Sequence, residues 1–457
     1  MLSSWTQPDT LPSLLFVVCG LSFFIVLHRK VIRKESFFTT KLDNIPGIGW
    51  SGALASYLTA IRFLYDAQVM LENGYRRHHN SAFKIPFFDK WVIVFSDENK
   101  IQDIRRASNE QLSATVALQE LMHFDFSLGA EISEDPYHVA VITRFFSDQK
   151  MRLNFAGLLD EVETALSEQI PINKERAKIN AWELCRIIMF QSQSRLFVGV
   201  PLCRKKEYMS LNTQYAVAVM LSIHIMRCIP KFLHKPIRRY LSPFPGYIQK
   251  MTKLLQDHAH VCSNTQEQRD SHSPENIENV FLTALAQATE SHKNILSEMS
   301  MRLLAINFVS NWTSSLTLNF ALSRLALSPD LVPVLRQEVE TCITLQGWSH
   351  ASINNMYLLD SFIKESQRLS GVVGISLTRK AMKDFTFSDG TQISKGTLIA
   401  FPVQAIHYDE KNYNNARSFQ PWRFAQDQDN PPPQASPSPM TSPDTKFLEF
   451  GIGRHTW

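Results

Sequence analysis

The sequence lacks the motifs of several common enzyme classes. It has no G-x-x-x-x-G-K-[ST] phosphate loop, no G-x-G-x-x-G after a strand, no H-E-x-x-H and no G-x-S-x-G. Phosphoryl transfer, nicotinamide binding on a Rossmann unit, zinc-dependent proteolysis and lipase chemistry therefore lose their usual signals.

Cysteines are also few, and the positive and negative residues nearly balance each other. The 457 residues hold six cysteines and no C-x-x-C pair, which argues against a zinc cage and a secreted disulfide scaffold. Lys and Arg number 47 against 43 Asp and Glu, so the net charge of +4 offers no electrostatic footprint for nucleic acid. Hydrophobic residues make up 44%, which is enough for a sizeable core.

The N-terminal region contains one long uncharged run. Residues 11–27 carry no charge, and the basic stretch His28-Arg-Lys-Val-Ile-Arg-Lys34 follows directly. This length and charge order predict a transmembrane signal anchor at 11–27 with the bulk of the chain in the cytosol. A cleaved signal peptide and a buried core helix are the alternatives. Residues 28–62 are predicted to form a basic stop and a Pro/Gly hinge.

The rest of the chain is predicted to be one mostly α-helical domain, residues 63–457, with small β-sheets at both ends. The longest helical run covers 298–327. Residues 84–95 are β-branched and aromatic, and 385–393 contain an Asp389-Gly390 turn, so each predicts a hairpin.

Several short motifs follow one another in the second half of the chain. Glu365 and Arg368 form an E-x-x-R pair on a predicted helix, where a spacing of three places both on one face. The pair alone is common by chance, so the weight rests on the ordered set. The motifs after it are Arg379, Phe-Gln-Pro-Trp-Arg-Phe at 419–424, and Phe-Leu-Glu-Phe-Gly-Ile-Gly-Arg-His-Thr-Trp at 447–457.

This ordered set resembles the cytochrome P450 haem–thiolate monooxygenases, in particular the membrane-anchored fungal members. The resemblance implies the P450 fold, mostly α with small β-sheets, behind one transmembrane helix. It implies a haem cofactor and insertion of one atom of O2 into a lipophilic small molecule, such as a terpenoid or other secondary metabolite. It further implies electrons from an NADPH–cytochrome P450 reductase or cytochrome b5, and a place on the endoplasmic reticulum membrane.

The resemblance also assigns roles to individual residues. Glu365 and Arg368 would form a buried triad with Arg423, whose planar guanidinium suits a bidentate contact. The alternative is an exposed ion pair on one helix, which would need no second arginine.

Further residues would surround the oxygen and the haem. Thr313 falls where the family has a hydroxyl that donates to dioxygen and relays protons, unless it merely bonds back to the preceding helical turn. Trp312 stands where an acid or histidine is common, and an indole cannot shuttle protons. For His138 the rival interpretation is an ordinary surface histidine. The expected haem contacts are Arg379, His455, His138, Phe450 and Gly453.

The sequence departs from the family pattern at its last position. The pattern F-x-x-G-x-R/H-x-C-x-G places the axial cysteine at position 457, where this chain has tryptophan. The thiolate tunes the iron for O–O cleavage, and no residue of this chain is assigned as its metal ligand. We therefore expect the ligand loop and the last helix to be incomplete, through a truncated gene model or a degenerate copy.

Three classes of function follow. The first is the family's monooxygenase activity, which the chain as printed is not expected to show. The second is a non-catalytic member without bound haem. The third is an α-helical membrane-tethered scaffold unrelated to haem.

Overall fold

The computed structural model describes residues 45–49, 53–87, 90–171, 177–229, 231–268, 280–289, 294–425, 439–453 and 456. The predicted anchor at 11–27 and the basic stretch after it lie outside these residues. Across the described segments, no helix combines the length and the apolar character that a membrane crossing requires.

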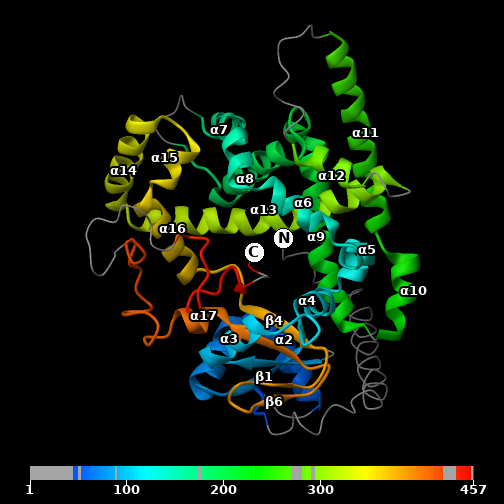
Figure 1. The fold of residues 1–457 in the computed structure, drawn as a ribbon, viewed down its shortest axis with the longest axis vertical. Helices are drawn as coiled ribbons and strands as arrows, with labels where there is room; N and C mark the ends of the chain where they lie inside the picture. Colours follow the sequence, from blue (N-terminus) through cyan, green and yellow to red (C-terminus); the bar gives the residue numbers. More distant parts are fainter. Residues whose placement is uncertain are drawn as a thin grey trace, which may run out of the picture.

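The first half of the chain is mainly helical (Figure 1). The first helix among the described residues begins at Ala53, inside the stretch 28–62 that was predicted as a basic stop and a Pro/Gly hinge. The elements are α2 (Ala53–Arg77), β1 (Ala82–Phe87), β2 (Lys90–Phe95), α3 (Glu98–Arg106), β3 (Leu112–Ser113), α4 (Ala114–Met122), the π-helix η1 (Asp125–Gly129), α5 (Ala130–Glu134), α6 (Tyr137–Phe145), α7 (Asp148–Gln169), α8 (Ala181–Val198), the 3-10 helix η2 (Leu202–Arg204) and α9 (Lys206–Cys228).

The second half contains the longest helix and the remaining strands. The predicted run at 298–327 is confirmed as part of α13, and the Asp389-Gly390 hairpin as the pair β5–β6. The elements are α10 (Lys231–Leu241), α11 (Phe244–Gln268), α12 (Phe281–Thr289), α13 (Ile295–Leu327), α14 (Leu331–Gln346), α15 (His350–Asn354), α16 (Tyr357–Leu369), β4 (Ile375–Ala381), β5 (Phe385–Thr386), β6 (Gln392–Ile393), β7 (Leu398–Pro402) and α17 (Val403–His407).

The main sheet joins strands from opposite ends of the chain. The predicted hairpin at 84–95 is confirmed as the antiparallel pair β1–β2, with Ala82 opposite Phe95. β7 then pairs in parallel with β2, and the strand order is β1-β2-β7-β4-β3. The small sheets expected at both ends of the chain are present, but the strand 398–402 joins the N-terminal hairpin in one five-stranded sheet, and β5–β6 forms a second, two-stranded sheet. In Figure 1 the five-stranded sheet forms the lower layer of the molecule.

Helix α13 crosses the middle of the molecule above the sheet (Figure 1). It contacts α8, α11, α12 and α16, and most of its N-terminal half is buried. A helix that is apolar on nearly all sides is expected in the interior of a large domain. The largest hydrophobic cluster, which includes Leu303 and Leu304, packs around it.

Helix α16 is the element that carries the E-x-x-R pair. Its residues from Ser361 to Leu369 are almost all buried, and no side chain caps it from its own N-cap residue. The carboxylate of Glu338, on α14, accepts instead from the backbone N–H groups of Leu358 (2.7 Å) and Leu359 (2.9 Å). This negative charge also complements the positive end of the helix dipole.

Replacing Glu338 by alanine is expected to lower the free energy of unfolding by about 1–2 kcal/mol, because two N–H groups at the start of α16 lose their acceptor. Urea denaturation followed by circular dichroism measures the change. The control is Glu340→Ala, which changes an exposed glutamate on α14, the helix that also carries Glu338. Equal effects of the two substitutions would contradict the capping role of Glu338.

Candidate functional site

Glu365 lies between two arginine side chains in the interior. Arg368 donates from Nε to Oε2 (2.7 Å) and from Nη2 to Oε1 (2.8 Å), so the contact is bidentate. Arg423 donates from Nε to both carboxylate oxygens, at 3.2 and 3.1 Å. Glu365 and Arg368 are fully buried. The structure therefore brings together the three residues that the sequence grouped, and the exposed helix pair is not what forms.

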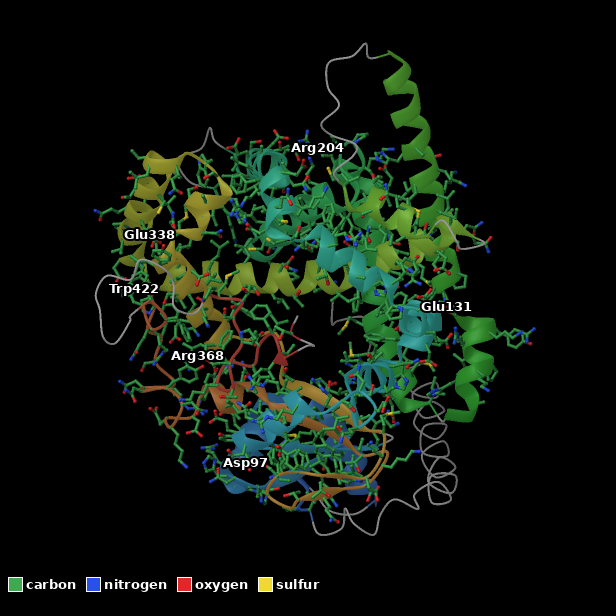
Figure 2. The ribbon with its side chains drawn as sticks, in the orientation of Figure 1. Asp97, Glu131, Arg204, Glu338, Arg368 and Trp422 are labelled. Carbon is green, nitrogen blue, oxygen red and sulfur yellow. The ribbon has the colours of Figure 1, made fainter. Side chains whose placement is uncertain are left out.

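The triad also binds the backbone at the end of α17 and in the turn-rich segment 408–425 that follows it. Arg368 Nη1 donates to the carbonyl oxygens of His407 (2.5 Å) and Ala416 (2.6 Å), and Arg423 Nη1 donates to that of Asn414 (2.8 Å). Charge-assisted bonds of this kind are stronger than neutral ones and fix geometry. Figure 2 shows Arg368 below α13, among the C-terminal segments.

The loop at 447–453 packs directly beside the triad helix. Phe447 and Leu448 are fully buried, and the Phe447 ring lies 4.9 Å from Lys364 Nζ on α16. The Phe450 ring is 6.4 Å from that of Phe447. Gly453 has φ +74°, a backbone conformation that residues with a side chain rarely adopt. A Cβ there would also lie only 2.9 Å from Arg105 Cγ, so both the backbone and the available space favour glycine. His455 and Trp457 lie outside the described residues.

Glu449, a partly buried residue of this loop, has a carboxyl group that points into the interior and that no sequence motif singles out. Its Oε1 accepts from Val372 N at 2.6 Å, while Oε2 is buried without a hydrogen-bond partner. Burial raises the pKa of this carboxyl from 4.5 to about 7, against the lowering effect of the backbone N–H groups. The loop is thus tied to the segment that follows α16 through a group that titrates near neutral pH.

Thr313 lies on α13 and bonds within its own helix. Its hydroxyl donates to the carbonyl oxygens of Val309 (3.1 Å) and Ser310 (3.2 Å), as in the alternative interpretation of this residue. The hydroxyl oxygen keeps its capacity to accept. The ring of Trp312 lies 5.6 Å from that of Trp182 on α8, beside a cavity of about 20 Å³ that has room for one water molecule.

The two proposed propionate partners in the described chain lie on different elements. Arg379 is on β4, nearly buried, and its Nη1 donates to the carbonyl oxygen of Thr378 at 2.9 Å. His138 is on α6, where its Nδ1 lies 2.9 Å from Nη1 of the buried Arg302. Burial and the charge of Arg302 lower the pKa of His138 to about 4, so its imidazole is neutral at pH 7. It could donate one hydrogen bond to a carboxylate but offers no positive charge.

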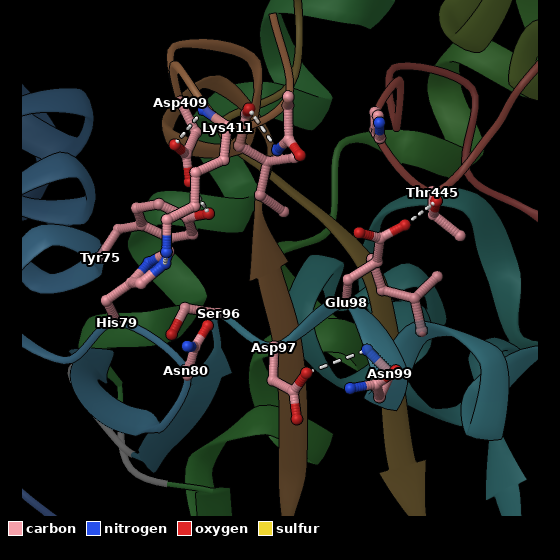
Figure 3. A pocket seen from close by; sticks show the side chains of 14 residues that line it. Tyr75, His79, Asn80, Ser96, Asp97, Glu98, Asn99, Asp409, Lys411 and Thr445 are labelled. Atoms are coloured by element: carbon pink, nitrogen blue, oxygen red, sulfur yellow. Dashed lines mark hydrogen bonds between the residues drawn. The ribbon is translucent and has the colours of Figure 1, made fainter.

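A larger cavity, of about 320 Å³, lies away from these residues, between the end of α2, the start of α3 and the segment after α17 (Figure 3). Polar side chains that line it form hydrogen bonds with one another. Tyr75 donates to Asp409 at 2.8 Å, and the hydroxyl of Thr445 donates to Glu98. With so little apolar lining it does not suit a lipophilic substrate.

The donor set matches haem only in part. Arg379 is a buried cation that could pair with a propionate, and Gly451 and Gly453 adopt positive φ in the loop that would carry the ligand. The residue at the ligand position is Trp457, whose indole nitrogen is a donor only. Cys185, Cys203 and Cys342 lie on α8, η2 and α14, and burial raises the pKa of each thiol. The described residues therefore provide no thiolate in this loop.

The comparisons with known proteins identify the family. The model of the family "Cytochrome P450" matches residues 76–456. This chain belongs to the cytochrome P450 family. The match excludes the scaffold unrelated to haem that the sequence left open.

The relatives are fungal P450 enzymes. The chain is 32% identical over 427 residues to cytochrome P450 monooxygenase 151 of Postia placenta, covering 91% of this chain and 83% of that protein. It is 28% identical over 425 residues to cytochrome P450 monooxygenase CYP512U6 of Ganoderma lucidum, covering 92% and 82%. Retinoic acid bound cyanobacterial CYP120A1 has the same fold, with a TM-score of 0.65, 19% identity, and coverage of 90% and 87%. The protein is thus a member of a monooxygenase family with the P450 fold.

Replacing Glu365 by glutamine is expected to lower the free energy of unfolding by about 3–5 kcal/mol, because two guanidinium groups lose their shared counter-charge in the interior. Denaturant unfolding and soluble yield report the effect. The matched control is Asp66→Asn, which breaks the exposed Arg62–Asp66 pair and should cost no more than about 0.5 kcal/mol. Comparable losses in the two variants would rule out a buried triad.

The Glu449 carboxyl is expected to make stability depend on pH. Its folded pKa of about 7 lies above the unfolded value of 4.5, so the folded state binds an extra proton between these values. Stability should therefore fall as pH rises from about 5 to 7 and stay low above that. Glu449→Gln should remove this slope and stabilise the protein at pH 8 by about 2–3 kcal/mol. Thermal unfolding at pH 5 to 8 measures it, with exposed Glu163→Gln as the control. An unchanged slope in Glu449→Gln would refute the assignment.

Proposed function

We propose that this protein belongs to the haem-dependent monooxygenases that insert one atom of O2 into a lipophilic small molecule. Haem, when bound through a thiolate, supplies the oxidative chemistry. The observation that carries the proposal is the buried triad of Glu365, Arg368 and Arg423, whose helix packs against the 447–453 loop, just before the family's ligand position in the sequence. A terpenoid or another secondary metabolite is the substrate class that the likeness to fungal members supports.

The chain's own residues would orient the bound groups. Arg379 would neutralise a haem propionate, with His455 and the neutral imidazole of His138 as weaker partners. Phe450 and Gly453 would shape the loop beside the porphyrin. Thr313 would accept or donate one hydrogen bond on the oxygen side, after its hydroxyl turns away from the carbonyl oxygens of α13. Trp312, packed on Trp182, has no ionisable group and would take no part in proton delivery.

The expected partners follow from the same proposal. Electrons would come from an NADPH–cytochrome P450 reductase, with cytochrome b5 as a second donor. The apolar segment 11–27 would anchor the protein in the endoplasmic reticulum membrane, with the domain on the cytosolic side, because basic residues follow it directly.

The second candidate function is that of a non-catalytic member of the family without bound haem. One observation favours it for the chain as printed: Trp457 occupies the position of the axial cysteine. The two candidates share the fold and differ in whether the chain binds haem through a thiolate.

The carbon monoxide difference spectrum of the reduced protein separates the two candidates. We expect no thiolate-type Soret band from the chain as printed and a gain of that band in Trp457→Cys. Trp348→Cys, which places a cysteine at an exposed tryptophan, should show none.

A thiolate-type band from the printed chain would overturn the assignment of position 457. The companion measurement is the transcript sequence around that codon. If the transcript encodes Cys-Pro-Gly from position 457 on, the protein made from it should show the thiolate-type Soret band. Absence of the band from that protein would overturn the monooxygenase proposal.

A further inference from the structure

His407 is a fully buried side chain at the end of α17. Its Nδ1 lies 3.1 Å from the carbonyl oxygen of Arg368, at the end of the triad helix. Its Nε2 lies 3.2 Å from the backbone N of Leu448, at the start of the 447–453 loop. The ring thus joins the triad helix to the loop through its two nitrogen atoms.

The two partners fix the protonation of the ring. A carbonyl oxygen can only accept, so Nδ1 must carry a hydrogen, and an amide N–H can only donate, so Nε2 must present a lone pair. The neutral Nδ1–H tautomer is the one form that satisfies both. Burial lowers the pKa of His407 to about 3, against the raising effect of the Arg368 carbonyl, so this form holds at any pH near neutral.

The face of the ring contacts the same loop. The imidazole is stacked on Phe447, with an angle of 8° between the planes and 5.2 Å between the centroids. His407 therefore holds Phe447 by packing and Leu448 by a hydrogen bond. Two neighbouring residues of the loop are fixed by one side chain.

The contact with the triad is reciprocal. Arg368 Nη1 donates to the carbonyl oxygen of His407 at 2.5 Å, while the ring of His407 donates to the carbonyl oxygen of Arg368. Because Arg368 is held in turn by Glu365, a shift of the triad must move His407, and with it the start of the loop.

We propose that His407 is a positioning residue that sets the place of the 447–453 loop relative to the triad. It does so in one neutral tautomer, through Leu448 N–H and the Phe447 ring. The inference rests on the proposed function only in that this loop would carry the haem ligand. The contacts of His407 form within the protein and do not require haem.

Hydrogen exchange followed by mass spectrometry tests the proposal on the full chain without haem. His407→Phe keeps an aromatic ring beside Phe447 and removes both hydrogen bonds. We expect exchange in a peptide covering 447–453 to become at least about tenfold faster, with no change in a peptide from α9. His407→Gln, whose amide can accept from Leu448 and donate to Arg368, should restore much of the protection.

Tyr408→Phe is the matched control. It removes the 2.7 Å bond from the neighbouring residue to the carbonyl oxygen of Leu369, which also ties α17 to α16 but does not touch the loop. It should leave exchange at 447–453 unchanged.

Several results would overturn the proposal. These are unchanged exchange at 447–453 in His407→Phe, an equal acceleration in α9, an equal effect of Tyr408→Phe, and no recovery in His407→Gln. A second readout is the ¹⁵N spectrum of histidine-labelled protein. A ring at position 407 that titrates near pH 6.5, or that carries its hydrogen on Nε2, also contradicts it. None of these readouts depends on haem, so they stand or fall separately from the carbon monoxide spectrum.

Discussion

The arrangement around the candidate site depends on one buried carboxylate that neutralises two guanidinium groups. An isolated charge in the interior would be strongly unfavourable, so Glu365 and its arginines must stay together. The donors that the carboxylate does not use bind carbonyl oxygens of residues 407, 414 and 416. A chain segment with little regular structure is thereby given a fixed path. The ionic group is better understood as a template for this path than as a source of net stability.

The triad helix and the segment after it also hold the 447–453 loop through side chains outside the triad. Lys364, next to Glu365, places its ammonium group against the Phe447 ring, and Glu449 binds the backbone at Val372. These ties come from the triad helix and from the segment just after it. The position of the loop is therefore set mainly by α16 and its surroundings, while α13 forms the opposite layer with Thr313. The residues that would act on oxygen and those that would hold the ligand loop thus belong to different parts of the fold.

The sequence predicted features that depend on local spacing. The hairpin at 84–95, the long helix α13 and the E-x-x-R pair on α16 each follow from residues close together in the chain. Arg423 was grouped with Glu365 only through the order of motifs typical of the family. The parallel pairing of β2 with β7 was missed, because it joins strands about three hundred residues apart and leaves no local pattern. His407 and Glu449 were missed for a similar reason. Their roles come from burial beside distant partners, and a single histidine or glutamate in the sequence gives no sign of that.

The contacts that order the site do not involve the residue at position 457. The contacts of the triad, His407 and Glu449 all come from residues before Arg454, and each forms within the protein. A change at position 457 removes none of them. Under the proposed function, the side chain there would decide instead whether a sulfur atom is presented to iron, which is a matter of chemistry at one atom. A scaffold of this kind can therefore keep its fold whether or not the ligand is present, because the interactions that order the loop and the atom that would bind iron are separate.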